Sequence, residues 1–275
     1  MVRKAFIVAL MFVICVLPLG LVTSVPRTDR EYVLEQQLLP SVRLLAREAL
    51  VRHVRAFRYG PDSTVTPSYY DRTYDLNQVR RVWFGLSPFD AWSGPAHVFV
   101  SFEFADSQYL AISVEARLER GETYSPWRGL LRQYELMYVV ADEADVIGVR
   151  SLVHDDPVYL YPGTANPAQA AFLLEALLRR TRELRSSPEY YHTLANNCAT
   201  NLADAVNAVA PGRVPWNRAL LLPGFSDDYA YRLGLLALDR PPAEVRARYR
   251  VDERARLANA SPGFSAAIRR GITPP

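Results

Sequence analysis

The chain has 275 residues, of which 49% are hydrophobic and 22% charged, a composition that excludes an intrinsically disordered protein. Its net charge is only +3 and it has no basic stripe or basic-aromatic run, so the sequence does not favour a nucleic-acid partner. It contains two cysteines, and only Cys198 lies outside the N-terminal apolar run, which excludes an internal disulfide framework.

The N-terminus combines a positive segment with an uncharged apolar run. Arg3 and Lys4 precede residues 5–22, a stretch about as long as the minimum that spans a bilayer. Pro18 and Gly20 also suit the end of a cleaved signal sequence. We therefore expect residues 1–24 to be a signal sequence or transmembrane anchor, with the anchor preferred. The positive residues then stay inside, and everything after residue 24 lies outside the cytoplasm.

The next segment has leucines at helical spacing. Leu34, Leu38 and Leu45 predict a helix, a break at Pro40 and a second helix within residues 31–57. Residues rich in Gly, Pro, Ser and Tyr then predict a loop. We interpret residues 25–71 as a helical lead-in, 72–240 as the main domain and 241–275 as a charged surface tail.

Two alternating segments predict a β-hairpin. Residues 96–104 and 109–117 each alternate apolar and polar side chains, with a plausible turn between them. Matching the apolar faces pairs Val100 with Ile112 and places His97 opposite Glu115. Side chains paired in this way have Cβ atoms roughly 5 Å apart. The sequence therefore predicts a histidine–carboxylate pair near the open end of the hairpin.

The remaining elements complete an α+β pattern. Residues 79–84, 134–140, 146–152 and 158–161 read as strands, and residues 119–130 and 211–228 as loops. Asn166 and Pro167 are a helix N-cap and first residue, and a strong helix follows them over residues 168–184. We expect a small antiparallel sheet packed against helices.

Cys198 is predicted to lie in the first turn of another helix. Asn196 and Asn197 are good N-cap residues, and Leu202 and Val206 begin an apolar stripe. Backbone N–H groups and the helix dipole stabilise a thiolate at such a position. A lone cysteine is nevertheless most often a small buried hydrophobic residue.

These residues suggest a nucleophile, a base and an orienting group. An imidazole within reach of a thiol can take its proton, and a third group fixes the tautomer. We therefore predict Cys198 as nucleophile, His97 as base and Glu115 as orienting residue, with the Cys198 N–H in an oxyanion hole. The candidates for a further oxyanion or substrate-positioning donor are Asn197, Asn196 and Thr200.

Other uses of these residues remain open. His192 is the second choice as base, and Glu115 alone is equally compatible with a solvated strand residue. The four histidines are scattered without a zinc-ligand spacing, so no metal site is predicted. No Gly-rich phosphate loop is present, so no cofactor is expected, and no nucleophile elbow supports a serine triad.

Several short motifs resemble the Lnb N-terminal periplasmic domain family, from about Arg72 to about Val209. They are Gly94-Pro95-Ala96-His97, Tyr109-Leu110-Ala111-Ile112-Ser113-Val114-Glu115, Tyr124-Ser125-Pro126, Arg132-Gln133-Tyr134-Glu135-Leu136, Tyr159-Leu160-Tyr161-Pro162 and Asn196-Asn197-Cys198-x-Thr200-Asn201. The resemblance implies an envelope-facing, papain-like thiol fold in permuted order, akin to NlpC-type peptidases and lecithin-retinol acyltransferases. By that resemblance Cys198 is the nucleophile and His97 its base.

The family's namesake is a bacterial lipoprotein N-acyltransferase, but it carries membrane segments after this domain. This sequence has no further apolar run after residue 24, so we do not extend the resemblance to lipoprotein N-acylation itself. Where this sequence has His192 the family often has another residue, which favours His97 as the base.

We therefore predict a cysteine-dependent acyltransferase or hydrolase at the bacterial inner membrane, with its domain in the periplasm. It would form a thioester at Cys198 and act on a lipid, lipoprotein or cell-wall substrate. The alternatives are a non-catalytic, membrane-anchored envelope binding protein and a cell-wall peptidase. A peptidase predicts an open cleft, whereas an acyltransferase predicts an apolar groove beside Cys198.

Overall fold

The computed structural model describes residues 25–60, 64–89, 94–259 and 261–272. The predicted signal sequence or anchor, residues 1–24, lies outside the described residues. Within the described ranges, no helix combines the length and the apolar character needed to cross a membrane.

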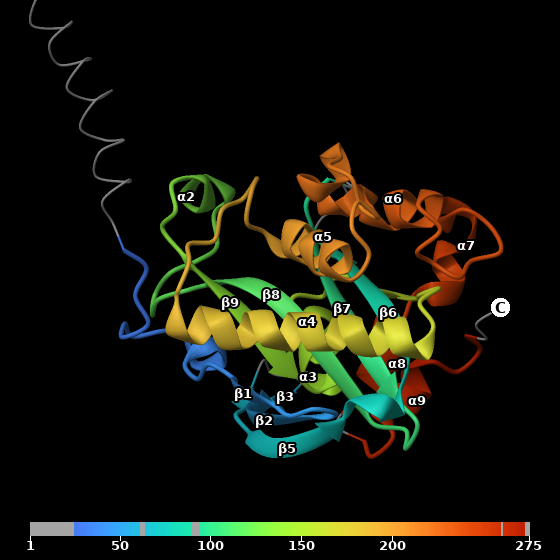
Figure 1. Cartoon of the computed structure of the whole chain (residues 1–275), viewed down its shortest axis with the longest axis horizontal. Coiled ribbons are helices and arrows are strands. Elements are labelled where there is room, and N and C mark those ends of the chain that lie inside the picture. Colours follow the sequence, from blue (N-terminus) through green and yellow to red (C-terminus); the bar gives the residue numbers. More distant parts are fainter. Residues whose placement is uncertain (1–24, 61–63, 90–93, 260, 273–275) are drawn as a thin grey trace, which may run out of the picture.

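An eight-stranded sheet forms the centre of the molecule (Figure 1). The strand order is β1-β2-β9-β8-β7-β6-β10, with β5 also paired to β2, and every pair is antiparallel except β2–β9. Its strands are β1 (Ser41–Leu44), β2 (Glu48–Arg55), β5 (Tyr69–Asp75), β6 (Val79–Pro88), β7 (Ala96–Phe104), β8 (Tyr109–Arg117), β9 (Glu135–Ala141) and β10 (Tyr159–Pro162). A separate two-stranded ribbon contains β3 (Arg58–Tyr59) and β4 (Val65–Thr66).

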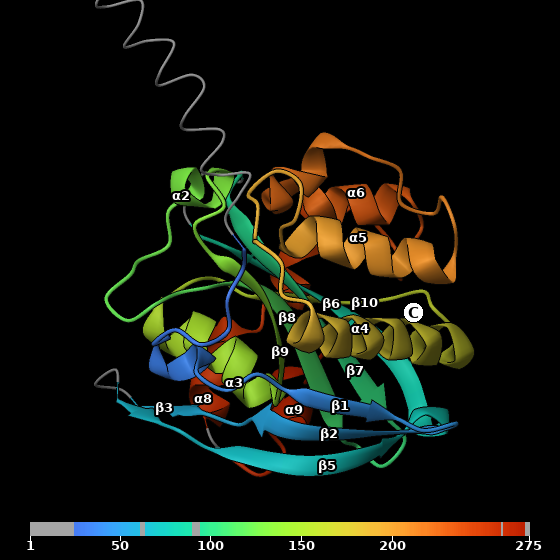
Figure 2. The same ribbon diagram turned by 60° about the vertical axis from the view of Figure 1, so that its left-hand side comes forward.

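Helices cover both faces of the sheet (Figures 1 and 2). One face packs against α4 (Pro167–Ser186) and α5 (Cys198–Val209), with α6 (Ser226–Arg232) beside α5. The other packs against α3 (Glu143–Gly148), α8 (Asp252–Ala258) and α9 (Phe264–Ile268). The remaining helical segments are η1 (Leu34–Gln36), η2 (Leu76–Gln78), α2 (Pro126–Leu130), the π-helical η3 (Val149–Val153), η4 (Arg218–Leu220), η5 (Pro223–Phe225) and α7 (Pro242–Tyr249).

The central hairpin has the predicted bounds and register. β7 and β8 cover residues 96–104 and 109–117, and Val100 pairs with Ile112. Val98 and Val100 therefore point toward α4 and α5, whereas His97 and Ser101 point to the opposite face. The α+β class is confirmed, although the sheet is larger than expected.

The predicted helical lead-in is wrong. Leu34, Leu38 and Leu45, which suggested helices, are exposed, so their spacing does not mark a buried face. The segment instead forms β1 and β2, in which Ala49 and Val51 alternate toward the core. The predicted loop that follows forms β3 to β5, and β5 is a polar strand that pairs only with β2.

Two further expectations are corrected. Residues 146–152 form the end of α3 and then η3 rather than a strand, because a short apolar run fits either structure. The C-terminal segment is not a surface tail: it forms α7 to α9, and Tyr249, Val251 and Ile268 are fully buried. In the sequence, the apolar residues of this segment are widely spaced among charged ones, so they form no pattern that predicts a buried helix. Short helices also occur in the predicted loops 119–130 and 211–228.

Candidate active site

Cys198 is the first residue of α5, and the helix start is firmly capped. The Asn197 side chain accepts a hydrogen bond from the Thr200 backbone N–H at 2.9 Å. In return, the Thr200 hydroxyl oxygen accepts one from the Asn197 N–H, also at 2.9 Å. This reciprocal capping box fixes the first turn and holds the cysteine at the positive end of the helix dipole.

The three predicted positioning residues all serve this local structure. The Asn197 amide donates to the carbonyl oxygens of Thr193 at 2.7 Å and Leu220 at 3.0 Å. The Asn196 amide donates to the Tyr190 carbonyl at 2.9 Å, and its oxygen accepts from Asn201 at 2.8 Å. Their side chains are therefore engaged in holding the helix start, and backbone N–H groups remain the natural donors for an oxyanion.

The thiol of Cys198 is buried against β7. Burial raises its pKa, while the backbone N–H groups of Val98, Ala199 and Cys198 itself favour the thiolate. Val98 directly follows His97, so the sulfur lies beside the peptide bond that joins these two residues. Among the hydrogen bonds of the described residues, none joins the thiol to His97.

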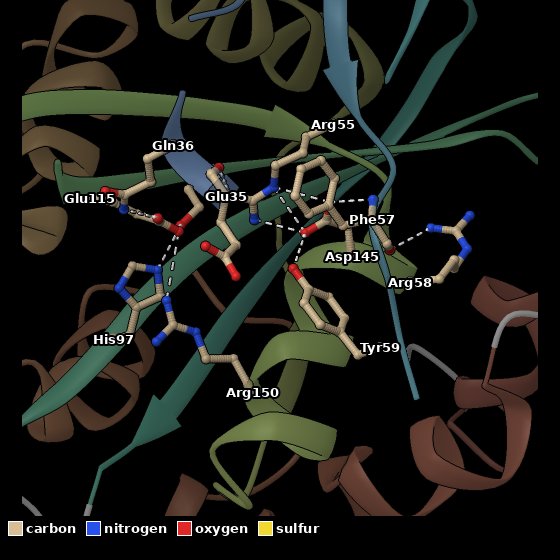
Figure 3. A network of polar contacts seen from close by, with 11 residues as sticks. Glu35, Gln36, Arg55, Phe57, Arg58, Tyr59, His97, Glu115, Asp145 and Arg150 are labelled. Carbon is tan, nitrogen blue, oxygen red and sulfur yellow. Dashed lines mark hydrogen bonds and ion pairs between the residues drawn. The ribbon is translucent and has the colours of Figure 1, made fainter. Parts of the chain in front are cut away.

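His97 and Glu115 are connected through a serine hydroxyl rather than directly (Figure 3). The β7–β8 ladder ends at the pair Phe99 and Ser113, two residues before the predicted pair of His97 and Glu115. His97 Nε2 lies 2.7 Å from Ser113 Oγ, which donates to Glu115 Oε1 at 2.8 Å. The predicted direct pair is thus replaced by a three-residue chain.

The charges around this chain keep the histidine neutral and the glutamate ionised. Burial, Arg150 and His154 lower the pKa of His97 from 6.5 to about 3. Burial alone would raise the pKa of Glu115, but Arg55, Arg150 and His97 outweigh it and lower the pKa to about 2. At neutral pH the site therefore contains a neutral imidazole beside a carboxylate.

This charge state determines the tautomer of His97. An ionised Glu115 can only accept, so the Ser113 hydroxyl donates to it. The Ser113 oxygen must then accept from His97 Nε2–H. The unprotonated ring nitrogen is therefore Nδ1.

Glu115 is held by further partners outside the hairpin. Its second oxygen accepts from Gln36 Nε2 at 3.0 Å, and an Arg150 nitrogen lies 3.7 Å from the first. Arg55 is in turn fixed by a buried ion pair with Asp145 at 2.7 Å (Figure 3). Asp145 also accepts from the Phe57 N–H at 2.7 Å, so the network extends across several elements of the sheet's polar face.

An apolar cavity of 230 Å³ lies on the other face of the sheet, along α5 and next to the residue that follows Cys198. Val98 and Ala199, the neighbours of His97 and Cys198, both line it. It is lined by side chains of β6, β7, α4, α5 and α6, among them Phe84, Val100, Leu173, Leu202, Val206 and Ala230. The lining on α5 extends from Ala199 to Val209, about 15 Å along the helix axis at 1.5 Å per residue.

The sequence reasoning missed several residues of the site. Ser113 carried a usable signal, because it alternates onto the same face as Glu115. Arg150 and Gln36 carried none, because both lie in segments whose structure was predicted incorrectly. His192, the second choice as base, accepts from the backbone N–H groups of Leu194 and Ala195 at 3.2 Å and stabilises a turn.

The described residues contain no cluster of three or more His, Cys, Asp or Glu side chains that could hold a metal ion. In comparisons with known proteins, a family model described as the Lnb N-terminal periplasmic domain matches residues 66–224. No curated protein and no solved structure matches the chain.

Proposed function

Because this match covers more than half of it, the chain belongs to the Lnb N-terminal periplasmic domain family, and we propose that it is a cell-envelope thiol acyltransferase or hydrolase. We further propose that its domain is papain-like in permuted order. A strand that carries the base precedes a helix whose first residue is the nucleophile, which supports this assignment. The family description supports a periplasmic domain.

In the proposed reaction, His97 Nδ1 accepts the proton of the Cys198 thiol. The thiolate sulfur attacks the carbonyl carbon of an ester or amide, and the oxyanion is stabilised by backbone N–H groups at the start of α5. The tetrahedral adduct expels an alcohol or amine, which takes the proton from His97. The product is a thioester at Cys198.

Water or an amine then resolves the thioester. His97 removes its proton as it attacks the thioester carbonyl, and the proton passes to the departing sulfur. Ser113 and Glu115 hold the imidazole through its Nε2–H in both steps, which leaves Nδ1 to accept and release the proton. Because burial raises the pKa of the thiol and lowers that of the imidazole, the resting site is a neutral pair. Proton transfer therefore belongs to the chemical step.

The single observation that carries the proposal is the apolar cavity along α5, which begins at Ala199, the residue after Cys198. A peptidase that cuts cell-wall crosslinks needs an open, polar cleft, whereas this cavity is lined mainly by aliphatic and aromatic side chains. We propose that it receives the hydrocarbon chain of an acyl donor, which places the carbonyl at the helix N-terminus. The substrate is then a lipid or a lipid-modified protein rather than a peptide crosslink.

The test uses the full chain in detergent with p-nitrophenyl laurate and p-nitrophenyl acetate. We expect p-nitrophenolate release and a laurate adduct on Cys198 by mass spectrometry, with the long ester at least about ten-fold faster, a difference of roughly 1.4 kcal/mol. Cys198→Ala should remove both the release and the adduct.

A cavity-filling variant separates acyl binding from general reactivity. Ala203 lines the cavity, so Ala203→Phe should slow the laurate reaction about ten-fold and leave the acetate reaction unchanged. Ala208 is exposed on the same helix and does not line the cavity, so Ala208→Phe should change neither rate. Equal rates for both esters in all variants would exclude the acyl pocket, and an unmodified Cys198 would favour the non-catalytic binding protein.

A further inference from the structure

A group of exposed apolar side chains surrounds α2, and we propose that this face rests on the surface of a lipid bilayer. The group, called here the α2 patch, consists of Tyr124, Trp127, Leu131 and Leu194. Trp127 is 76% exposed, and the other three are between 40% and 45% exposed. Trp and Tyr favour the interface between water and lipid, where an amphipathic ring suits both environments.

The patch is one continuous structure built from two segments. The Thr193 hydroxyl donates to the Pro126 carbonyl at 2.7 Å, which joins the loop carrying Leu194 to the start of α2. The hydroxyls of Tyr124 and Tyr191 lie 3.2 Å apart, and their rings meet edge to face. The four apolar side chains are thus held on a fixed support.

The path of the chain identifies the bilayer as the occupant. The apolar run of residues 5–22 ends five residues before Arg27, whose N–H donates to Glu135 at 3.2 Å. Five residues span at most about 18 Å. The backbone of Glu135 also forms an antiparallel β-bridge with Tyr190, which is close in sequence to Thr193 and Leu194 in the loop packed against α2 (Figures 1 and 2). An anchored N-terminus therefore holds this end of the domain close to the bilayer.

Charge at the patch suits an anionic lipid surface. Arg132 is exposed directly after Leu131, and its charge contributes to lowering the pKa of His192 in the neighbouring loop. Basic residues beside exposed aromatics favour membranes that contain acidic phospholipids. The same loop leads to Cys198, so a docked domain presents the start of α5 toward the membrane.

This inference rests on the predicted anchor and gives the proposed acyl transfer its access to lipid. Its test is independent of catalysis. The full chain is reconstituted in vesicles of phosphatidylethanolamine and phosphatidylglycerol that contain lipids brominated near the headgroup end of the acyl chain. The fluorescence emission of Trp127 is obtained as the difference between the native chain and Trp127→Phe. We expect brominated lipid to quench most of this emission. Cys198→Ala should give the same quenching.

The control places a tryptophan on the opposite side of the molecule. Leu257 on α8 is 89% exposed, and Leu257→Trp in the Trp127→Phe background should be quenched by aqueous iodide but not by brominated lipid. Emission from Trp127 that behaves like this control would overturn the proposal. Protection of Trp127 from iodide without quenching by lipid would indicate a protein occupant, such as a second copy, and would also overturn it.

Discussion

The two faces of β7 differ in chemistry although alternate residues of one strand build them. On one face, His97 belongs to a charged network with Ser113 and Glu115. On the other, Val98 and Val100 line a cavity whose lining is mainly apolar. Cys198 lies against this strand, and the backbone N–H of Val98 favours its thiolate.

The difference shows how a single sheet can separate proton transfer from hydrophobic binding. The polar face holds buried charges in opposite pairs, such as Arg55 with Asp145 and Arg269 with Glu143, which stabilises their ionised states. The apolar face contains a cavity lined mainly by apolar side chains, which suits a ligand that binds by burying apolar surface. Variants on one face should therefore change the chemistry, and variants on the other should change substrate preference.

The largest expected effect comes from removing the base on the polar face. His97→Asn should lower the rate of Cys198 acylation by about 10²–10⁴-fold for both laurate and acetate esters, because the thiol loses its proton acceptor. Burst kinetics of p-nitrophenolate release measure this rate. His53→Asn on β2 is the matched control, since Asn tolerates its left-handed backbone, and it should retain activity. A His97→Asn protein with normal rates would remove His97 from the mechanism.

The next effect tests whether the C-terminal helices belong to the polar face. Arg269 on the end of α9 pairs with the buried Glu143 at 2.7 Å. Arg269→Met leaves that carboxylate buried without an opposite charge and should cost about 3–5 kcal/mol in the free energy of unfolding. The exposed pair Arg232–Asp228 is the control, and Arg232→Met should cost less than about 1 kcal/mol.

Chemical denaturation followed by tryptophan fluorescence measures both variants. Adding Glu143→Gln to Arg269→Met should recover part of the loss, because the unpaired charge is removed. If Arg269→Met is as stable as the native chain, the C-terminal segment does not contribute its buried charge to the core.

A smaller effect is expected from the serine that joins the histidine to the glutamate. Ser113→Ala should lower the acylation rate about 10–100-fold, because the hydrogen bonds that fix the tautomer of His97 are worth about 1.5–3 kcal/mol next to a charge. Ser113→Thr keeps the hydroxyl and should restore most of the rate. Ser101→Ala is the control: its hydroxyl lies on the same face but donates to Glu143, so it should affect stability and not rate.

The sequence predicted the parts of this site that depend on local patterns. The hairpin register and the capped start of α5 follow from alternation and from N-cap chemistry, and both were correct. The register alone did not show that the ladder ends at Ser113, before the predicted pair of His97 and Glu115. The motif resemblance to the Lnb family was confirmed.

The missing parts depend on contacts between distant segments. Gln36 and Arg150 reach Glu115 from η1 and η3, and neither segment has a periodic pattern that reveals its structure. Arg269 lies more than a hundred residues from Glu143, in a segment whose charges suggested a surface tail. Such pairs are selected by burial in the folded protein, which a local pattern does not encode.

The last test is the dependence of stability on pH, which separates the polar face from the apolar one. The folded state lowers the pKa of His97 from 6.5 to about 3 and that of Glu115 from 4.5 to about 2. Below pH 6.5 the unfolded chain therefore binds protons that the folded chain does not, and the free energy of unfolding falls by about 1.4 kcal/mol per pH unit for each such group. The His97 contribution acts between pH 6.5 and about 3, and the Glu115 contribution between 4.5 and about 2. Urea titrations across this range measure the slope of the free energy of unfolding against pH. Between pH 6 and 4.5 this slope should be shallower in His97→Asn, whereas Ala203→Phe on the apolar face should keep the native slope. Identical slopes in all three proteins would show that His97 titrates normally in the folded state.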